Sequence, residues 1–390
     1  MTKTIQVADI ESRISALVQE LLSTKFNNTS AYNNIMGMVA QQSILSSTGG
    51  KRLRALLTIE SFLAATAAHT HDKAVTNNPS NYSHSLSHNA NSDTANTLTT
   101  SQLDSNSLIL DVACALEVFQ TAALIHDDII DDADLRRGKP SAHKALTTQT
   151  HNESIGVGLG LMIGDILATG SIAIVQNASN AYSQNHKMLN ELVTPFIAMQ
   201  REVSIGQVLD LGIEMMSFEN LQELREASFE VFRWKTASYT TIAPIELGFL
   251  TAGIPAQDAR KLALAIGEPL GIAFQLVDDL LDIGAGSHPT GKPIGGDIRE
   301  GKRSVLLADT LEHLSQDDSE KIIRLYQQTQ RTDDDVAFCL EKIHEANAIE
   351  ISKQRVNELW QTTCTAISQS PIPASSQHKL REICKKFITL

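Results

Sequence analysis

Apolar residues along this chain recur at the three- and four-residue spacing of a helix face, and the alternation typical of a β-strand is hard to find. This pattern predicts helices over residues 5–22, 33–46, 55–68, 111–132, 159–176, 189–216, 218–243, 258–282, 304–314 and 376–387. Residues 322–367 are expected to form one or two further helices at the surface. Pro244 is expected to interrupt the helix over residues 218–243. The sequence therefore predicts an all-α protein.

One stretch departs from this pattern. Residues 70–108 are dominated by Asn, Ser, Thr and His and contain few large apolar side chains. Such a segment cannot bury enough surface to offset the entropy of ordering it. We expect a disordered or loosely packed insertion, without chemistry, inside a single domain that spans residues 1–390. His84 and His88 have the spacing of a helical metal pair, but the polar surroundings favour no such role.

Composition narrows the classes of function. A chain of 390 residues allows either two average domains or one large helical domain, and 42% hydrophobic residues are enough for a sizeable core. The formal net charge of −13 argues against nucleic acid or an anionic membrane as the main partner. The four cysteines have no ligand-like pairing, which indicates reduced thiols in a cytoplasmic protein.

No stable membrane insertion is expected. Residues 155–175 form the most apolar stretch, but Asp165 at its centre and five glycines favour a buried helix over a membrane span. The first 22 residues carry charges every few positions and lack the apolar core of a secretion signal.

The candidate chemistry begins where an apolar helix ends in a cluster of acidic residues. Asp127, Asp128, Asp131 and Asp132 arrive together, and Asp127 and Asp131 lie one helical turn apart on one face. Carboxylates so close together repel each other. A hard divalent cation such as Mg²⁺ would neutralise them, because it accepts one or two carboxylates, retains waters and binds substrate phosphate. A solvated acidic helix end is the alternative interpretation of this motif by itself.

The same pattern recurs at residues 271–282, where a second apolar helix ends in Asp278, Asp279 and Asp282. Asp278 and Asp282 again lie one turn apart. A chance run of surface charge would not be expected to repeat with the same apolar approach. The two acidic ends are therefore predicted to face each other across a cavity and to hold several metal ions.

Basic residues complete the candidate site. Gly49 and Gly50 allow backbone to approach an anion closely, and Lys51 and Arg54 follow on the next helical turn. Other cations follow or flank the acidic motifs: Arg136, Arg137, Lys235, Lys292 and Lys302. Each of these alone would more often be a solvated surface charge. Together they outline two anion sites, one bridged by metal and one held directly by Lys and Arg.

Two further groups of residues allow two interpretations each. Gln207 and Asp210 lie one turn apart, which fits either a contact on a helix surface or a position near the cavity. A basic C-terminal group fits either a cover over the cavity mouth or the ordinary preference of cations for a helix C-terminus. Its members are Lys379, Arg381, Lys385 and Lys386.

In type and order these motifs resemble those of the trans-isoprenyl diphosphate synthases, the polyprenyl synthetase family, and in particular the geranylgeranyl and polyprenyl diphosphate synthases. The matching motifs occupy residues 49–54, 127–131, 136–140, 235–236, 274–282, 291–292 and 300–302. Several independent motifs in one order are a specific signal, whereas a lone Asp-Asp-x-x-Asp would not be. The resemblance implies an isoprenoid synthase type I fold, a single large helical bundle around a central cavity, and a homodimer.

The resemblance also implies a role for each matching residue. Asp127, Asp131 and Asp278 would bind three Mg²⁺ ions, with Asp128 and Asp282 as further ligands or supports. The diphosphate of an allylic substrate (dimethylallyl, geranyl or farnesyl) would contact Arg136, Lys235, Lys292 and Lys302. Isopentenyl diphosphate would contact Lys51, Arg54, Gln120 and Arg137, with Gln120 where many bacterial relatives have His. Lys235, Thr236 and Gln275 would line the carbocation, and His126 would be structural.

Product length is expected to depend on the helix that leads to the first acidic motif. Ala122 and Ala123 are small, so no aromatic plug lies one turn before Asp127, and Phe119 one turn deeper would form the floor. This predicts an all-trans product of about geranylgeranyl length. The alternatives are a longer quinone side chain or a farnesyl product. From other classes, a class I terpene cyclase and a non-catalytic partner subunit remain open.

Overall fold

A computed structural model describes residues 5–24, 27, 29–76, 100–182, 186–286 and 294–389. For residues 68–76, 100–105, 182 and 186–189 it describes the backbone alone.

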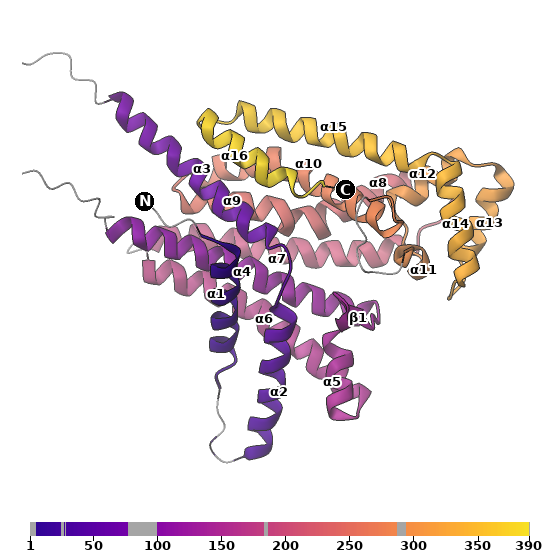
Figure 1. Cartoon of the computed structure of the whole chain (residues 1–390), viewed down its shortest axis with the longest axis horizontal. Coiled ribbons are helices and arrows are strands. Elements are labelled where there is room, and N and C mark those ends of the chain that lie inside the picture. Colours follow the sequence, from indigo (N-terminus) through magenta and orange to yellow (C-terminus); the bar gives the residue numbers. More distant parts are fainter. Residues whose placement is uncertain are drawn as a thin grey trace, which may run out of the picture.

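The described chain is all-α apart from one short hairpin, as predicted (Figure 1). The first half contains α1 (Val7–Leu21), α2 (Ser30–Ser47), α3 (Leu53–Thr76), α4 (Thr100–Ile130), β1 (Leu135–Arg136), β2 (Lys139–Pro140), α5 (Ala142–Thr150), α6 (Glu153–Tyr182) and α7 (His186–Ile213). The second half contains α8 (Leu221–Val231), the π-helix η1 (Phe232–Ile242), α9 (Ala243–Thr251), α10 (Ala256–Asp282), α11 (Gly296–Glu300), α12 (Val305–His313), α13 (Gln316–Tyr326), α14 (Asp333–Glu345), α15 (Ala348–Gln369) and α16 (Ala374–Lys385).

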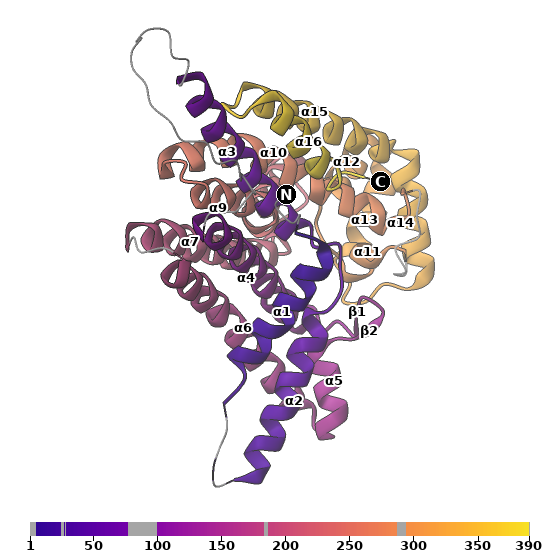
Figure 2. The ribbon, with the colours of Figure 1, turned by 60° about the vertical axis from the view of Figure 1, so that its left-hand side comes forward.

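Long helices form the body of the bundle, and shorter ones extend from it. α4 packs against α6, α10 packs against both η1 and α15, and α7 packs against η1. In Figure 1, α15 and α16 run along the top, α13 and α14 close the right-hand end, and α1 and α2 project below. Figure 2, a side view, shows α3 beside α16 and α6 beside α7. One large apolar cluster joins α1, α3, α4, α6, α7, α9, α10 and α16 into a single core.

Glycines bring the backbone of α10 unusually close to η1. A Cβ atom at Gly271 would lie 2.5 Å from the Cα atom of Ala237, and one at Gly267 would lie 2.9 Å from the Cα atom of Ile242. Real side chains are not tolerated at such distances, so these two positions set how closely the helices pack. The contact places the second acidic motif, at the end of α10, beside the residues that η1 carries.

η1 is a π-helix, in which hydrogen bonds run from residue i to i+5 and residues five apart lie one above another. Lys235 and Thr240 therefore lie on one side of η1. Sequence analysis predicted one helix here, interrupted at Pro244, and this prediction was wrong. Pro244 lies in the first turn of α9, directly after the π-helix, and the chain remains helical from α8 through α9.

Other expectations need smaller corrections. The range 322–367 holds parts of three helices, α13, α14 and α15, where one or two were expected. The polar segment 70–108 is helical at both ends, where α3 continues to Thr76 and α4 begins at Thr100. Residues 77–99, with His84 and His88, lie outside the described residues.

Among the residues that the structure describes, two helices are apolar and long enough to cross a membrane by length and composition, Asn106–Ile130 and Glu153–Ala181. The apolar window of the first is 78% buried inside the protein, but that of the second only 39%. The expectation of a buried helix over 155–175 was therefore only half right. One face of α6 packs on α4 and α5, and the other exposes Ile155, Leu161 and Met162. The four cysteines are free.

Candidate active site

The first acidic motif ends α4 and is joined at once by a basic hairpin. Asp132 has a positive φ of 50°, which stops the helix, and β1 and β2 follow. Arg137 (φ 54°) and Gly138 (φ 74°) form the two-residue turn, and two positive φ angles are what a tight hairpin of this twist requires. The hairpin returns Arg136 to Asp128, where its Nε donates to Oδ1 at 2.7 Å.

Lys235 on η1 joins the same motif from the other side. Its Nζ atom donates to Asp127 Oδ1 at 3.0 Å and to Asp210 Oδ2 on α7 at 2.5 Å. Burial opposes ionisation of Asp127, but the charges of Lys235, Lys302 and Arg136 together outweigh it and lower the pKa of this carboxyl. Asp210 thus meets the first acidic motif through Lys235, so a contact confined to the surface of one helix does not describe it.

Asp131 lies in a less neutralised environment than Asp127. Burial, together with the charge of Asp127, raises the pKa of Asp131 to about 6. The Nζ atom of Lys302 lies 3.9 Å from Asp131 Oδ2. The first motif thus contains two neighbouring carboxylates that protein cations neutralise only in part.

The three carboxylates of the second acidic motif lie in three different surroundings. Asp278 is exposed and lines a cavity with Lys51 and Arg137. Asp282 Oδ2 accepts the backbone N–H of Asp297 at 3.0 Å and so caps the short helix α11. Asp279 is buried, and complete burial, together with the nearby charge of Asp297, raises its pKa well above the ordinary value.

A chain of hydrogen bonds links the second motif to η1. Thr236 Oγ1 donates to Gln275 Oε1 at 2.9 Å, and Gln275 Nε2 donates to Asp279 Oδ1 at 3.0 Å. This chain sets the orientation of the Gln275 amide. It leaves the oxygen atoms of Thr236 and Gln275 together at the contact between η1 and α10.

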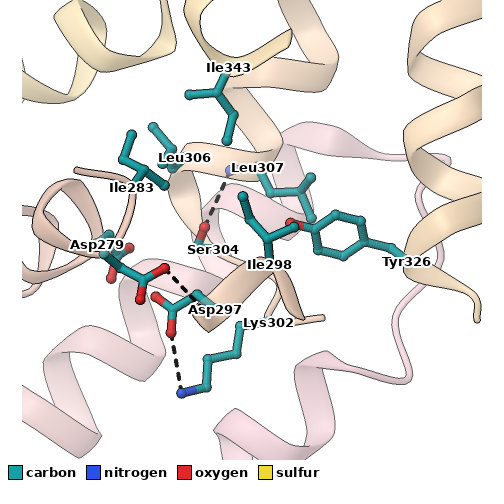
Figure 3. Close-up of a pocket in the computed structure, with 11 residues that line it drawn as sticks. Asp279, Ile283, Asp297, Ile298, Lys302, Ser304, Leu306, Leu307, Tyr326 and Ile343 are labelled. Atoms are coloured by element: carbon teal, nitrogen blue, oxygen red, sulfur yellow. Dashed lines mark hydrogen bonds and ion pairs between the residues drawn. The ribbon is translucent and has the colours of Figure 1, made fainter. Parts of the chain in front are cut away.

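Lys302 lies between the two acidic motifs. Its Nζ atom is 3.4 Å from Asp297 Oδ1 and 2.9 Å from Glu300 Oε2, in addition to its contact with Asp131. Figure 3 shows Lys302 reaching toward Asp297 beside a small cavity of about 20 Å³ that Asp279 also lines. Burial opposes its charge, but these carboxylates hold the pKa of Lys302 well above the ordinary value. Lys302 therefore connects the end of α4 to the segment that follows α10.

A second, larger cavity of about 280 Å³ lies beside the Gly49-Gly50 turn. Its lining includes Gly50, Lys51, Arg54, Gln120, Arg137, Phe274, Asp278, Lys386 and Thr389. Arg137 Nη1 donates to the carbonyl of Gly49 at 2.9 Å, and a Cβ atom at Gly50 would lie 3.2 Å from Arg137 Nη2. The absence of a side chain at Gly50 thus makes room for the guanidinium. Among the C-terminal cations, Lys386 does line the cavity.

Arg54 lies deeper than the sequence suggested. It is buried, its Nη2 donates to Thr240 Oγ1 at 2.7 Å, and its guanidinium lies 4.4 Å from the centre of the Tyr239 ring. Tyr239 in turn meets the edge of Phe119 at 6.1 Å between ring centres. The cavity and the residues proposed to set product length are therefore joined through one aromatic side chain. Phe119 and Ala122 are buried and Ala123 is partly buried.

Sequence reasoning missed Arg52, which lies between Lys51 and Arg54 in the chain. Arg52 is buried and donates to Glu11 Oε1 at 2.8 Å and to Glu117 Oε2 at 3.1 Å, and it also bonds the carbonyl of Ser47. It holds α1, α4 and the Gly-Gly turn together. Its partners lie at distant sequence positions, so no local pattern marked it.

The remaining expectations are quickly placed. His126 Nε2 lies 3.3 Å from the carbonyl oxygen of Leu161, in keeping with a structural role. Lys292 lies outside the described residues. Asp297 and Tyr239 also belong to the site but were not singled out in the sequence. A signal existed only for Asp297, which follows two glycines within a basic loop.

The sequence model of the polyprenyl synthetase family matches residues 38–343, which include both acidic motifs and the cations around them. The chain belongs to the polyprenyl synthetase family. This membership confirms the family that the motifs indicated.

Known relatives support the fold and span several product classes. A short chain isoprenyl diphosphate synthase from Methanothermobacter thermautotrophicus is 32% identical over 215 residues, 55% of this chain and 60% of the relative. A geranylgeranyl diphosphate synthase from Sulfolobus acidocaldarius is 33% identical over 213 residues, 54% of this chain and 58% of the relative. An octaprenyl diphosphate synthase from Haemophilus influenzae is 30% identical over 205 residues, 52% of this chain and 55% of the relative. The chain thus spans somewhat more than half the length of these relatives.

A solved structure matches over nearly the whole chain. The geranylgeranyl pyrophosphate synthase of Corynebacterium glutamicum, in complex with isoprenyl diphosphate and magnesium, has a TM-score of 0.76 and 28% identity. The match covers 98% of this chain and 99% of that one. The predicted type I fold is confirmed.

The acidic residues suit Mg²⁺, the ion that this family uses. Within the described residues, no three acidic, His or Cys side chains gather into an all-protein metal cage. Mg²⁺ does not need one, because it binds through one or two carboxylates together with waters and substrate phosphate. The incompletely neutralised pair Asp127 and Asp131 is a donor set of this kind.

Proposed function

We propose that this protein is a trans-prenyltransferase that condenses isopentenyl diphosphate with an allylic diphosphate in an Mg²⁺-dependent reaction. The observation that carries the proposal is the arrangement of two acidic helix ends with Lys302 between them, beside a separate basic cavity. Lys302 Nζ lies 3.9 Å from Asp131 Oδ2 of the first acidic end, and Lys302 lines one small cavity with Asp279 and Asp282 of the second. Two diphosphate sites of different character are what a condensation of two diphosphates requires.

In this proposal the allylic diphosphate binds at the acidic ends. Asp127, Asp131 and Asp278 hold three Mg²⁺ ions, with Asp128 and Asp282 in support. Bound Mg²⁺ supplies positive charge where negative charge builds on the leaving diphosphate. Lys235, Arg136 and Lys302 bind the diphosphate oxygens directly, joined by Lys292 from outside the described residues. Their role is to favour heterolytic cleavage of the allylic carbon–oxygen bond.

Isopentenyl diphosphate binds in the cavity of about 280 Å³. Lys51, Arg54, Gln120 and Arg137 line it. The alkene of isopentenyl diphosphate attacks the allylic cation, a carbon–carbon bond forms, and a proton passes to the departing diphosphate. The oxygens of Thr236 and Gln275 stabilise the cation, while the apolar wall excludes water.

We propose an all-trans product of about geranylgeranyl length. Phe119 is buried and packs edge-on against Tyr239, which suits a floor, while Ala122 leaves room above it. Longer-chain and farnesyl products remain the alternatives, and the names of the relatives, from geranylgeranyl to octaprenyl, do not choose among them.

Two functions of other classes are less well supported. A class I terpene cyclase needs no second diphosphate site, whereas this chain has a basic cavity beside Gly50. A non-catalytic partner subunit would be expected to lose its aspartates, whereas both motifs are intact here.

We also propose a homodimer. Apolar side chains remain exposed on the neighbouring helices α6 and α7 and in the turn after α7: Ile155, Leu161, Met162, Ile205, Val208, Leu211 and Met215. Val208 is 68% exposed and Met215 86% exposed. An apolar surface of this kind marks an interface, and a second copy of the chain supplies a matching surface.

The deciding experiment is incubation of the purified protein with Mg²⁺, isopentenyl diphosphate and one allylic primer at a time, with products identified by mass. We expect prenyl diphosphates that lengthen in five-carbon steps, and no product when the metal is removed with EDTA. Asp127→Ala serves as the inactive control. Cyclised hydrocarbons from an allylic diphosphate alone would instead support the terpene cyclase. Absence of any product with every primer would contradict the proposal.

A further inference from the structure

We propose that Asp210 is a positioning residue: it keeps the ammonium of Lys235 paired when Mg²⁺ occupies Asp127. The inference rests on the proposed role of Asp127 as a metal ligand and assigns a task to a residue that lies outside both acidic motifs.

The geometry shows one cation shared by two carboxylates. Lys235 Nζ lies 3.0 Å from Asp127 Oδ1 and 2.5 Å from Asp210 Oδ2, so its ammonium bridges α4 and α7 through η1. The side chain of Lys235 is only 23% exposed. If this ammonium lost one of its carboxylate partners, bulk water could not fully replace it, because burial penalises an unpaired charge.

Mg²⁺ and Lys235 therefore compete for Asp127. A metal ion that binds an oxygen of Asp127 requires the ammonium to withdraw, at least in part, from that carboxylate. Asp210 is already in contact and can keep the ammonium paired while it turns toward the diphosphate. Without Asp210, Asp127 would be the only carboxylate of the described residues within hydrogen-bond distance of Lys235. Metal binding would then have to break the last of these bonds.

The backbone fixes the distance on which this exchange depends. A Cβ atom at Gly206 would lie 2.2 Å from the backbone nitrogen of Lys235, so α7 and η1 touch at this residue. Asp210 lies one turn beyond Gly206 on the same face of α7. The same glycine that permits the contact thus aligns the carboxylate with the ammonium.

Asp210→Asn tests the proposal because it keeps the size of the side chain and removes its charge. The probe is Mg²⁺ with inorganic pyrophosphate, followed by calorimetry at fixed pyrophosphate, which requires no turnover. We expect the Mg²⁺ concentration at half-saturation to rise about tenfold, since losing one charge-assisted hydrogen bond shifts an equilibrium by that order. In activity assays the KM of the allylic substrate should rise and that of isopentenyl diphosphate should not.

Glu214→Gln is the matched control. Glu214 is exposed directly after α7, and its substitution removes the same charge, but the hydrogen bonds of Lys235 go to Asp127 and Asp210. It should change the half-saturation by less than about twofold, as expected of a screened surface charge. If Asp210→Asn does not fold, as judged by circular dichroism and thermal unfolding, Asp210→Ser replaces it with the same expected result.

Lys235→Met separates a positioning role from a direct one. If Asp210 acts through Lys235, Asp210→Asn should have little further effect on Mg²⁺ half-saturation in the Lys235→Met background. An equal effect in both backgrounds would mean that Asp210 binds the metal or acts by charge alone, and would overturn the proposal. So would an unchanged half-saturation in Asp210→Asn itself. A wild-type protein that binds Mg²⁺ and pyrophosphate but forms no prenyl product would instead refute the proposed function.

Discussion

Individual aspartates of one motif behave differently because their neighbours differ. Lys235 lowers the pKa of Asp127 against the effect of burial, whereas burial and the charge of Asp127 raise the pKa of Asp131 to about 6. Asp128 is held by Arg136, and burial still raises its pKa. Aspartates that look identical in the sequence motif therefore differ in the pKa of their carboxyl groups and in their partners.

Replacing Phe119 should change the product. Phe119→Ala removes the buried ring that meets Tyr239, so the growing prenyl chain can extend further and longer products should appear. The substitution should also cost about 3–5 kcal/mol of stability, as is usual for truncating a buried aromatic residue. Product lengths are read by mass spectrometry. Phe196→Leu, at a fully buried ring on α7, is the control and should lower stability without lengthening the product. An unaltered product distribution in Phe119→Ala would exclude Phe119 as the floor.

Acid should weaken the contact between Glu11 and Arg52. The hydrogen bond from Arg52 lowers the pKa of Glu11 below the ordinary 4.5, so the folded state releases this proton more readily than the unfolded state. Its stabilisation is therefore present above about pH 4.5 and is lost as the pH falls through the lower, folded-state pKa. Glu11→Gln should reduce stability at neutral pH and flatten its decline in acid, as measured by urea unfolding across this range.

The control for that measurement is Glu20→Gln on the exposed side of the same helix, which should leave the acid decline unchanged. A decline in Glu11→Gln as steep as that of the wild type would show that this pair does not contribute to acid sensitivity.

At the scale of elements, helix contacts set by glycine decide where the polar side chains meet. Gly206 brings α7 onto η1, and Gly271 and Gly267 bring α10 onto the opposite part of η1. The π-helix thus receives Asp210 from one side and Gln275 from the other. Its wider turn lets Lys235 and Thr240 face the site together.

Gly206→Ala should disrupt the site as well as the packing. The added methyl group would overlap the Lys235 backbone at 2.2 Å, which should cost about 1–3 kcal/mol or more and displace the ammonium from Asp127 and Asp210. Gly212→Ala in the same helix meets nothing within 4 Å and should be neutral or stabilising by up to about 1 kcal/mol. Thermal unfolding and prenyl transfer of both variants check this. Equal behaviour of the two would argue against a close contact between α7 and η1.

At the scale of the whole molecule, the exposed apolar surface of α6 and α7 needs a partner. Val208→Asp places a charge in the centre of that surface and should convert the proposed dimer to a monomer, because a buried unpaired charge is costly at an interface. Sedimentation velocity gives the mass. Leu63→Asp, at another exposed apolar position on α3, should leave the mass unchanged. A wild type that sediments as a monomer would remove the basis for the homodimer.

Much of this protein followed from local pattern. Helical spacing predicted an all-α chain, and the two acidic helix ends and the Gly-Gly turn were found without the fold. These features are local: a helix depends on residues three and four apart, and an acidic cluster is visible as a run of letters. The family resemblance supplied the type I fold and the roles, which spacing alone did not.

Tertiary structure decided which side chains meet. Three residues of the site depend on partners on other helices. Arg52 contacts Glu117, Tyr239 contacts Phe119, and Asp210 contacts Lys235. Arg54 lines the basic cavity, and only the fold shows that Thr240 and Tyr239 also hold its guanidinium there. The π-helix and the continuity through Pro244 depend on packing against α7 and α10. Contacts between distant residues leave no periodic trace in a sequence, so only the folded chain determines them.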